Sequence, residues 1–286
     1  MGMFFEEHAK LLSDFARVSQ STGARADYVQ GGGGNTSVKL PGGLMAIKAS
    51  GFCLSDIRPD KAYAVLDGAD LRNFYLTTEP SELADVEKEG SARAKADIRH
   101  IDGLADLRPS VEAGFHSILK TFVVHTHSVY ANLAACSTTC RPIAAQAFAG
   151  ANYTWSWVPY TDPGANLTFA IRDELRRVEA ETGKAPSVIL MQNHGIIVHD
   201  DDPDTALAIH TDANERLARM FGLSGTSFPK IAVREIAAGI YAADVPYLAE
   251  QFRTGGYTQE FLMTQPLYPD QMVFLTDTFY LDQSSL

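Results

Sequence analysis

The sequence lacks the features that would place a protein in a membrane or direct it out of the cell. No stretch of about 18 consecutive apolar residues occurs in its 286 residues, which argues against a membrane span. The first segment carries acids at Glu6 and Glu7 and is typical of an amphipathic helix, not of a signal peptide. The three cysteines, Cys53, Cys136 and Cys140, cannot all pair within the chain. These features predict a cytoplasmic protein with reduced thiols.

Positive charge is also scarce. The chain has 24 lysines and arginines against 35 acids, a formal net charge of −11, which argues against binding nucleic acid or anionic lipid. A small anionic substrate remains compatible with this charge, because a few backbone amides and one lysine can hold a single phosphate. With 45% hydrophobic and 21% charged residues, the composition is that of a globular protein with a substantial core.

Helical and strand-like patterns alternate along the chain and indicate a layered α/β domain. Residues 37–40 and 44–48 are strand-like around a Pro-Gly-Gly turn, which predicts a hairpin. Further strands are expected at 121–128 and, with a turn inside, at 187–200; helices are expected at 1–23, 80–100, 110–120, 128–137, 168–182 and 203–221. We predict a domain over 1–220 and a C-terminal extension over 221–286 that packs on it and ends in a strand.

Three of the eight histidines occur in two short apolar segments. Side chains alternate along a strand, so His125 and His127 point to the same face and can reach one ion. His194 follows the apolar run VILM, where a bend would direct it away from the strand end. Three imidazoles with an open fourth position are typical of a catalytic zinc site, although manganese, iron or cobalt also accept imidazole. The alternative is that they are hydrogen-bonded core histidines.

A carboxylate precedes this histidine pair. Ser110 is a plausible helix N-cap, which places Glu112 and His116 four residues apart on one helix face. A carboxylate near a metal can serve as a fourth ligand or as a general acid/base. Alternatively, Glu112 only complements the positive end of the helix.

A glycine run at 31–34 could let backbone amides approach an anion closely. It does not fit the nucleotide-binding motifs, because no lysine precedes the Ser/Thr pair and a strand follows. The end of the hairpin offers a second such corner near Lys48; the alternative for both is an ordinary turn. Together the two corners make candidate anion-binding residues of Gly34, Asn35, Thr36, Lys48, Ser50 and Gly51.

Six stretches, in their order along the chain, resemble the class II aldolase/adducin family: GGGGNTS, IKASG, PSVEAGFH, VVHTHS, VPYTDPG and MQNHG. The resemblance covers about residues 8–220. The family includes aldolases for fuculose 1-phosphate and rhamnulose 1-phosphate and the ribulose 5-phosphate 4-epimerase. It implies a single-domain α/β fold, a three-layer αβα sandwich around a mainly antiparallel sheet, usually assembled as a tetramer with sites between subunits.

The resemblance also implies roles for individual residues. His125, His127 and His194 match the zinc ligands, and Glu112 matches the catalytic acid/base. Tyr160 matches a tyrosine that reaches the active site of a neighbouring subunit. The positions that match phosphate-binding residues are Asn35, Ser50, Gly51 and Ser110.

The sequence departs from the family pattern in two places. Val111 stands where the family often has a second serine, and the segment from Glu112 to His125 is shorter than in the fuculose-type enzymes. This shortening and the tail PLYPDQMVFL are similar to the aldolase half of the bifunctional rhamnulose-1-phosphate aldolase/alcohol dehydrogenases.

The resemblance implies a zinc-dependent aldolase that acts on a ketose phosphate through a metal-bound enediolate. An epimerase, a sugar-acid phosphate decarboxylase or a dehydratase on the same fold would use the same chemistry. A non-catalytic, adducin-like interaction module is the alternative from another class.

Overall fold

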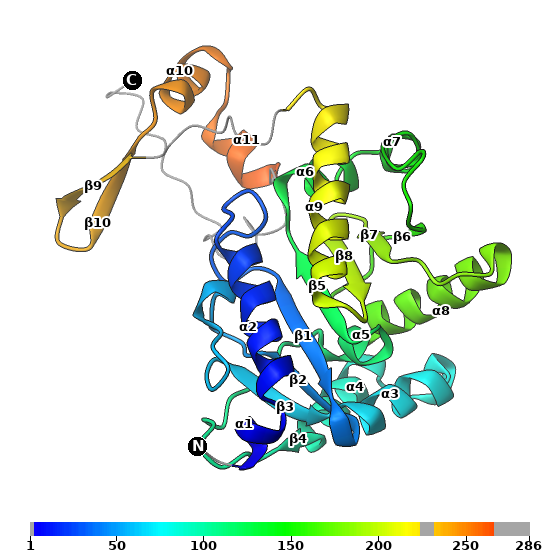
Figure 1. Cartoon of the computed structure of the whole chain (residues 1–286). Coiled ribbons are helices and arrows are strands. Elements are labelled where there is room, and N and C mark those ends of the chain that lie inside the picture. The colour runs from blue at the N-terminus through cyan, green and yellow to red at the C-terminus, as the bar shows by residue number, and fades with distance from the viewer. Residues whose placement is uncertain (1–2, 224–231, 266–286) are drawn as a thin grey trace. The chain divides into compact units, whose positions relative to one another are not determined.

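A computed structural model describes residues 3–223 and 232–265 of the chain (Figure 1). The chain forms two compact units, residues 1–220 and residues 221–286. The first unit contains the three histidines of the predicted metal site. That the second unit packs on it stays a prediction.

The first unit is built on an eight-stranded sheet in the order β4-β3-β2-β1-β5-β8-β7-β6. All neighbouring strands are antiparallel except β6 and β7, which are parallel. The strands are β1 (Asn35–Leu40), β2 (Leu44–Lys48), β3 (Tyr63–Asp67), β4 (Ile98–Arg99), β5 (Phe122–Thr126), β6 (Trp155–Val158), β7 (Val188–Met191) and β8 (Gly195–Asp200). The central pair β1 and β5 aligns Asn35 with His125.

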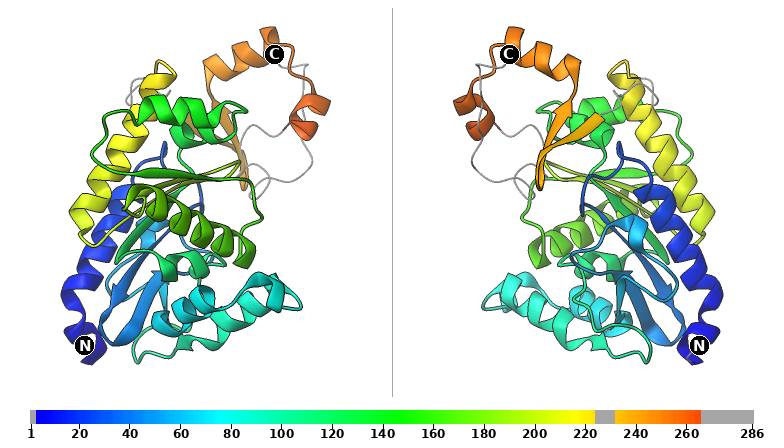
Figure 2. Two further views of the ribbon diagram at one scale, coloured as in Figure 1. Left: turned by 90° about the vertical axis from the view of Figure 1, so that its right-hand side faces the viewer. Right: turned by 90° about the vertical axis from the view of Figure 1, so that its left-hand side faces the viewer.

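Helices cover both faces of this sheet, which confirms the predicted three-layer α/β fold (Figure 2). The helices α2 (Ala9–Gly23) and α9 (Pro203–Met220) pack on one face. The other face carries α3 (Gly68–Thr77), α5 (Ala113–Ile118) and α8 (Ala165–Thr182), with α4 (Val86–Ala96) against α8. The remaining helices of the described part of this unit are α1 (Met3–Glu7), α6 (Val129–Ala135), α7 (Cys140–Ala147) and the short η1 (Pro41–Gly43), η2 (Leu54–Asp56) and η3 (Pro80–Glu82).

The alternation of side chains along β5 divides its residues between two hydrophobic clusters. Phe122 and Val124 pack in the cluster under α2 and α9. Val123 points the other way, into the cluster under α3, α5 and α8. His125 has the parity of Val123, so the strand directs its imidazole toward α5. By the same alternation on β1, Asn35 and Ser37 point to one face of the sheet and Thr36 points to the other.

Most of the elements expected from the sequence are present. The hairpin of β1 and β2, the helix that ends at Gly183 in the left-handed conformation, and the helix that begins at Pro203 are confirmed. The N-terminal helix is broken by a turn at His8. The expected helix over 80–100 is shorter, because a separate turn over Pro80–Glu82 precedes it.

The prediction that Ser110 caps the following helix is wrong. The helix α5 begins at Ala113, and Glu112 occupies the N-cap position. The Ser110 hydroxyl instead accepts a hydrogen bond from the Glu112 backbone N–H at 3.3 Å, within a turn that precedes the helix. Glu112 therefore lies just outside α5, where its side chain can turn toward the strand ends.

The described part of the second unit holds a hairpin and two helices. The hairpin joins β9 (Ala232–Ala237) and β10 (Ile240–Asp244), and the helices are α10 (Pro246–Thr254) and α11 (Gln259–Thr264). The strand expected at the end of the extension, within the PLYPDQMVFL tail and beyond, lies outside the described residues. Among residues 3–223 and 232–265, no helix combines the length and the apolar character needed to cross a membrane.

Candidate metal centre

Two chain segments bring the three histidines together. His125 is in β5 and His127 follows one residue after that strand ends at Thr126. His194 lies in the tight turn between β7 and β8, in which Asn193 has a positive φ of 51° and the His194 N–H bonds the Met191 carbonyl. Because β8 pairs with β5, the turn is held beside the end of β5.

The ring nitrogens of the three histidines converge. One ligand nitrogen from each lies within 4.8 Å of the others, and the Nε2 atoms of His125 and His127 are 3.1 Å apart. Ligands about 2.0–2.1 Å from a tetrahedral zinc ion would be roughly 3.3 Å from one another. The predicted cluster is therefore present, with a spacing that suits one small divalent cation.

The protonation state of His125 also suits a metal ligand. Its Nδ1–H donates to the Ile196 carbonyl at 3.0 Å, which leaves the lone pair of Nε2 directed at the cluster. Burial lowers the pKa of His125 to about 3, although the Glu112 carboxylate opposes this shift. The imidazole is thus neutral near pH 7, which is the form that binds metals. These residues fit a divalent cation.

Glu112 faces the cluster from its position before α5. Its Oε1 is 3.1 Å from Nε2 of His194, and its Oε2 is 3.5 Å from Nε2 of His125. The side chain is only 8% exposed. Burial acts to raise the pKa of Glu112, but the imidazoles of His125 and His194 outweigh it and hold this pKa well below its usual range. An ionised carboxylate at this distance can act as a base or as a further ligand.

Asn35 and Ser110 form hydrogen bonds with Glu112 and with each other. The Asn35 amide donates to Oε2 of Glu112 at 2.5 Å and to the Ser110 hydroxyl at 3.0 Å. Asn35 can reach both because the register of β1 and β5 places it directly opposite His125. Asn35 was predicted as an anion-binding residue, and nothing in the sequence indicated its bond to the carboxylate.

The end of the β1–β2 hairpin, one of the two predicted anion-binding corners, lies against the turn that holds Ser110 and Glu112. The bridge between Ala49 and Pro109 brings the hairpin end against the turn before α5, and the Ser50 hydroxyl donates to the Pro109 carbonyl at 3.1 Å. Gly51 has a φ of 86° and open space around it. Ser50, Gly51 and Ser110 thus border the site from two loops.

Gly34 and Lys48 shape the loop that leads into β1. Gly34 has a φ of 67°, and a Cβ there would lie 2.6 Å from the His125 carbonyl, so only glycine allows this close approach. The buried Lys48 ammonium donates to the carbonyls of Phe52 at 2.7 Å and Gly32 at 3.2 Å. Burial lowers its pKa. Lys48 therefore ties the glycine run to the hairpin end.

Two predicted site residues are not part of the cluster within this chain. Thr36 points to the opposite face of the sheet, where its hydroxyl bonds Ser19 of α2 at 2.7 Å. Tyr160 is 54% exposed, and its hydroxyl donates to Asp162 at 2.9 Å. The backbone N–H of Tyr160 bonds the side chain of Gln192, which shares a turn with His194.

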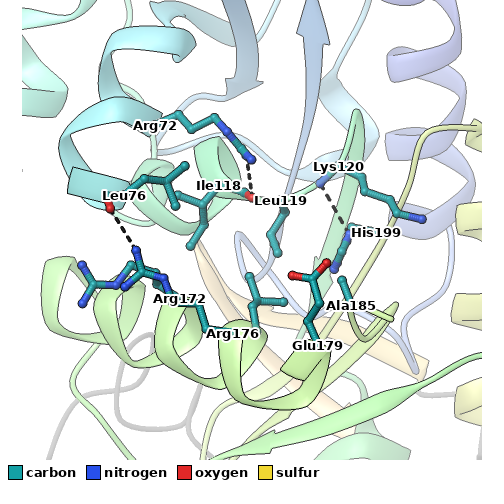
Figure 3. Close-up of a pocket in the computed structure, with 11 residues that line it drawn as sticks. Arg72, Leu76, Ile118, Leu119, Lys120, Arg172, Arg176, Glu179, Ala185 and His199 are labelled. Carbon is teal, nitrogen blue, oxygen red and sulfur yellow. Dashed lines mark hydrogen bonds between the residues drawn. The ribbon is translucent and has the colours of Figure 1, made fainter. Parts of the chain in front are cut away.

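A pocket of about 310 Å³ lies near the other end of β5, before Phe122 (Figure 3). It is lined by four cationic side chains, but each already has a partner. Lys120 pairs with Asp200 at 2.9 Å and Arg172 with Glu79 at 3.1 Å, while Arg72 and Arg176 donate to the carbonyls of Ile118 and Leu76. The histidine cluster therefore remains the candidate site.

Comparison with known proteins points to one family. Residues 13–221 match the model of the "Class II Aldolase and Adducin N-terminal domain". No curated protein matches the chain.

Several solved structures share the fold. The N-terminal class II aldolase domain of a conserved protein from Thermoplasma acidophilum is 20% identical, with a TM-score of 0.60, covering 73% of this chain and 93% of that one. YgbL from Klebsiella pneumoniae, described as a putative aldolase/epimerase/decarboxylase, is 18% identical, with a TM-score of 0.51 over 79% and 94% of the two chains. An aldolase II superfamily protein from Pseudomonas syringae is 16% identical, with a TM-score of 0.50 over 86% and 90%.

Proposed function

The chain belongs to the class II aldolase and adducin family, and from this premise we propose that it is a metal-dependent aldolase acting on a ketose phosphate. The observation that carries the proposal is the convergence of His125, His127 and His194 with a buried carboxylate, Glu112, facing them. A scaffold protein has no need for this combination of three converging imidazoles and a buried carboxylate.

The three histidines would hold a divalent cation, zinc or another ion that accepts imidazole. When bound, this cation supplies a Lewis acid for the carbonyl and hydroxyl oxygens of the sugar. The phosphate would lie in the corner bordered by Gly34, Asn35, Ser50, Gly51 and Ser110, where backbone amides and hydroxyls are grouped. Lys48 stabilises this corner by donating hydrogen bonds to the carbonyls of Gly32 and Phe52 in its two loops.

The proton transfers belong to Glu112 and Tyr160. In the synthesis direction the ionised Glu112 removes a proton from the carbon of the ketose fragment, that carbon bonds the aldehyde carbon, and the Tyr160 phenol donates its proton to the new alkoxide. The proton on Glu112 then passes to solvent, and the Tyr160 phenolate takes one from solvent. Cleavage is the reverse: it starts from a protonated Glu112 and a Tyr160 phenolate, Tyr160 removes the hydroxyl proton, the carbon–carbon bond breaks with its electron pair on the ketose fragment, and Glu112 protonates that carbon. Because Tyr160 is exposed, we assign it to the site of a neighbouring subunit in a homotetramer.

Metal content and one substitution test the proposal. We expect about one divalent cation per chain in the purified protein, and aldehyde release from at least one member of a panel of ketose phosphates. Glu112→Gln should retain the metal and lower kcat by roughly 10²- to 10⁴-fold, the usual contribution of a general acid/base.

The control is Glu181→Gln, a carboxylate with a 59% exposed side chain on α8, which should leave the rate unchanged. A metal-loaded Glu112→Gln enzyme with full activity would contradict the role of Glu112. Absence of bound metal, even after reconstitution, would favour an adducin-like interaction module. Epimer, decarboxylated or dehydrated products would redirect the proposal to another reaction on the same fold.

A further inference from the structure

His116 is a completely buried histidine that the proposed chemistry does not use. It lies in α5, four residues after Glu112, and both of its ring nitrogens are hydrogen-bonded. Nδ1 is 2.7 Å from the Ser37 hydroxyl, and Nε2 is in a short contact with Oδ1 of Asn35. Burial, together with the charge of Lys39, holds the pKa of His116 well below its usual range.

The donors and acceptors in this chain of contacts can be arranged in only one way. The Asn35 amide must present its NH2 group to the Glu112 carboxylate, because a carboxylate oxygen only accepts. Oδ1 of Asn35 then faces His116 and requires a donor, so Nε2 of His116 carries the hydrogen. Nδ1 is left as an acceptor, and the Ser37 hydroxyl donates to it.

The orientation of Asn35 matters because its amide is the hydrogen-bond donor to Oε2 of Glu112. Glu112 occupies the N-cap position before α5, and its side chain makes no capping bond to the helix. Its Oε2 accepts the Asn35 amide and lies 3.5 Å from Nε2 of His125, and its Oε1 lies 3.1 Å from Nε2 of His194. If the Asn35 amide rotated by 180°, Oδ1 would face the carboxylate and repel it.

We propose that His116 is a positioning residue: by donating to Asn35 it fixes the amide that holds Oε2 of Glu112 and leaves Oε1 toward His194. The consequence for turnover rests on the proposed function, whereas the hydrogen-bond arrangement itself does not.

The order of the side chains along β1 makes this relay possible. Asn35 and Ser37 are two residues apart on one strand, so both face α5 and can engage the two nitrogens of one imidazole. The His116 ring also stacks on Phe115, with centroids 4.7 Å apart and planes inclined by 23°. Phe115 in turn meets the His125 ring edge-on at 5.7 Å. Loss of the ring would therefore alter packing as well as hydrogen bonding.

Two matched substitutions separate these effects. In His116→Gln the amide nitrogen can occupy the place of Nε2 and still donate to Asn35, whereas in His116→Asn the shorter amide replaces Nδ1 and reaches only Ser37. Both variants lose the stacked ring. We expect His116→Gln to keep kcat within about threefold of the parent and His116→Asn to lose roughly 10- to 100-fold, with KM and metal content unchanged in both.

Equal losses of kcat in the two variants would assign His116 a packing role and overturn the proposal, as would full activity in both. A thermal unfolding scan of each variant shows whether the fold is retained.

A second measurement does not depend on turnover. In the full chain labelled with ¹⁵N-histidine, long-range ¹H–¹⁵N correlations should show His116 as the neutral tautomer with its hydrogen on Nε2. The opposite tautomer would overturn the proposal whatever the enzyme does. The expected tautomer in a protein without activity on any ketose phosphate would refute the proposed function and leave the positioning of Glu112 intact.

Discussion

At the scale of single residues, the buried histidines differ in what their nitrogens bond. His125 donates from Nδ1 to the Ile196 carbonyl, and its Nε2 faces the other two histidines of the cluster. His199, far along β8, accepts the Lys120 N–H at 3.4 Å and is 2% exposed. His210 of α9 bonds the Thr126 hydroxyl at 2.8 Å. Burial lowers the pKa of all three and keeps them neutral near pH 7. What distinguishes the candidate metal ligand from the two structural histidines is therefore the set of groups around its ring nitrogens.

The burial of His199 predicts a dependence of stability on pH. Burial, aided by the charges of Lys39 and Lys120, lowers its pKa to about 3 in the folded protein, against an ordinary value of 6.5. Below pH 6.5 the unfolded chain binds a proton that the folded chain does not, so the free energy of unfolding falls as pH falls toward 3. His199 alone contributes a slope of about 1.4 kcal/mol per pH unit within this window and none above it.

Denaturant unfolding at several pH values measures this slope. His199→Asn retains an acceptor for the Lys120 N–H and should flatten the dependence by about one proton. His100→Asn is the control: that side chain is 68% exposed and its bond to Asp106 raises its pKa, so it is protonated in both the folded and the unfolded chain below pH 6.5, and its loss should leave the slope in this window almost unchanged. An unaltered slope in His199→Asn would show that His199 does not titrate as described.

At the scale of elements, the site depends on how closely β8 approaches the end of β5. Gly195 is the first residue of β8, and a Cβ there would lie 2.4 Å from the Thr126 carbonyl and 3.3 Å from the His127 ring. Gly34, which immediately precedes β1, approaches the carbonyl of His125 in the same way. Glycines on both sides of β5 thus let its neighbours close around the histidine pair.

Gly195→Ala should therefore weaken the site more than the fold. Overpacking costs about 1–3 kcal/mol, and here relief of the clash would move His127 and His194 apart. We expect a lower melting temperature and weaker zinc binding, measured by competition with a chromogenic chelator.

Gly68→Ala is the matched control for this change. A Cβ at Gly68 would lie 2.7 Å from Cβ of Met45, a similar clash in the core between α3 and β2 and away from the histidines. It should lower the melting temperature without altering zinc affinity. Equal zinc affinity in both variants would argue against a role for Gly195 in placing the ligands.

At the scale of the whole molecule, the proposed function requires a neighbouring subunit to supply Tyr160. Tyr160 is exposed and its hydroxyl bonds Asp162 of its own loop. The exposed surface near the cluster also includes Val111, next to Glu112, and Val129 and Leu133, on one face of α6. Apolar side chains beside the site are what a contact with a neighbouring subunit would cover.

Mixing two inactive variants tests whether sites are shared between subunits. Tyr160→Phe lacks the proposed acid/base on the aldehyde side, and Glu112→Gln lacks the one on the ketose side. After unfolding and refolding together in equal amounts, about a quarter of the sites should combine an intact Glu112 with an intact Tyr160 from a neighbour. Activity should return to about that fraction of the parent.

The same variants refolded separately and then combined are the control and should stay inactive if subunits do not exchange. If the jointly refolded oligomers recover no activity, Tyr160 and Glu112 do not act together in a site shared between two subunits.

The alternation of helices and strands, the hairpin and the histidine triad were all predictable from the sequence. Each depends on a short-range regularity of the sequence. The two-residue period of a strand places His125 and His127 on the same side, and Pro41 with two glycines marks the turn of the hairpin. The helix start at Ala113 was not predictable, because a serine before an acid is also typical of the turn that Ser110 forms.

What only the tertiary structure decided is the set of partners around Glu112. Asn35 and Glu112 are 77 positions apart in the chain, and His116 and Asn35 are 81 apart. Their contact depends on the register between β1 and β5 and on the direction from which α5 meets the sheet, neither of which has a local signal. The sequence by itself determined which groups could bind a metal. The pairing of distant strands decided which of Asn35 and Thr36 faces them, because a strand sends neighbouring side chains to opposite sides.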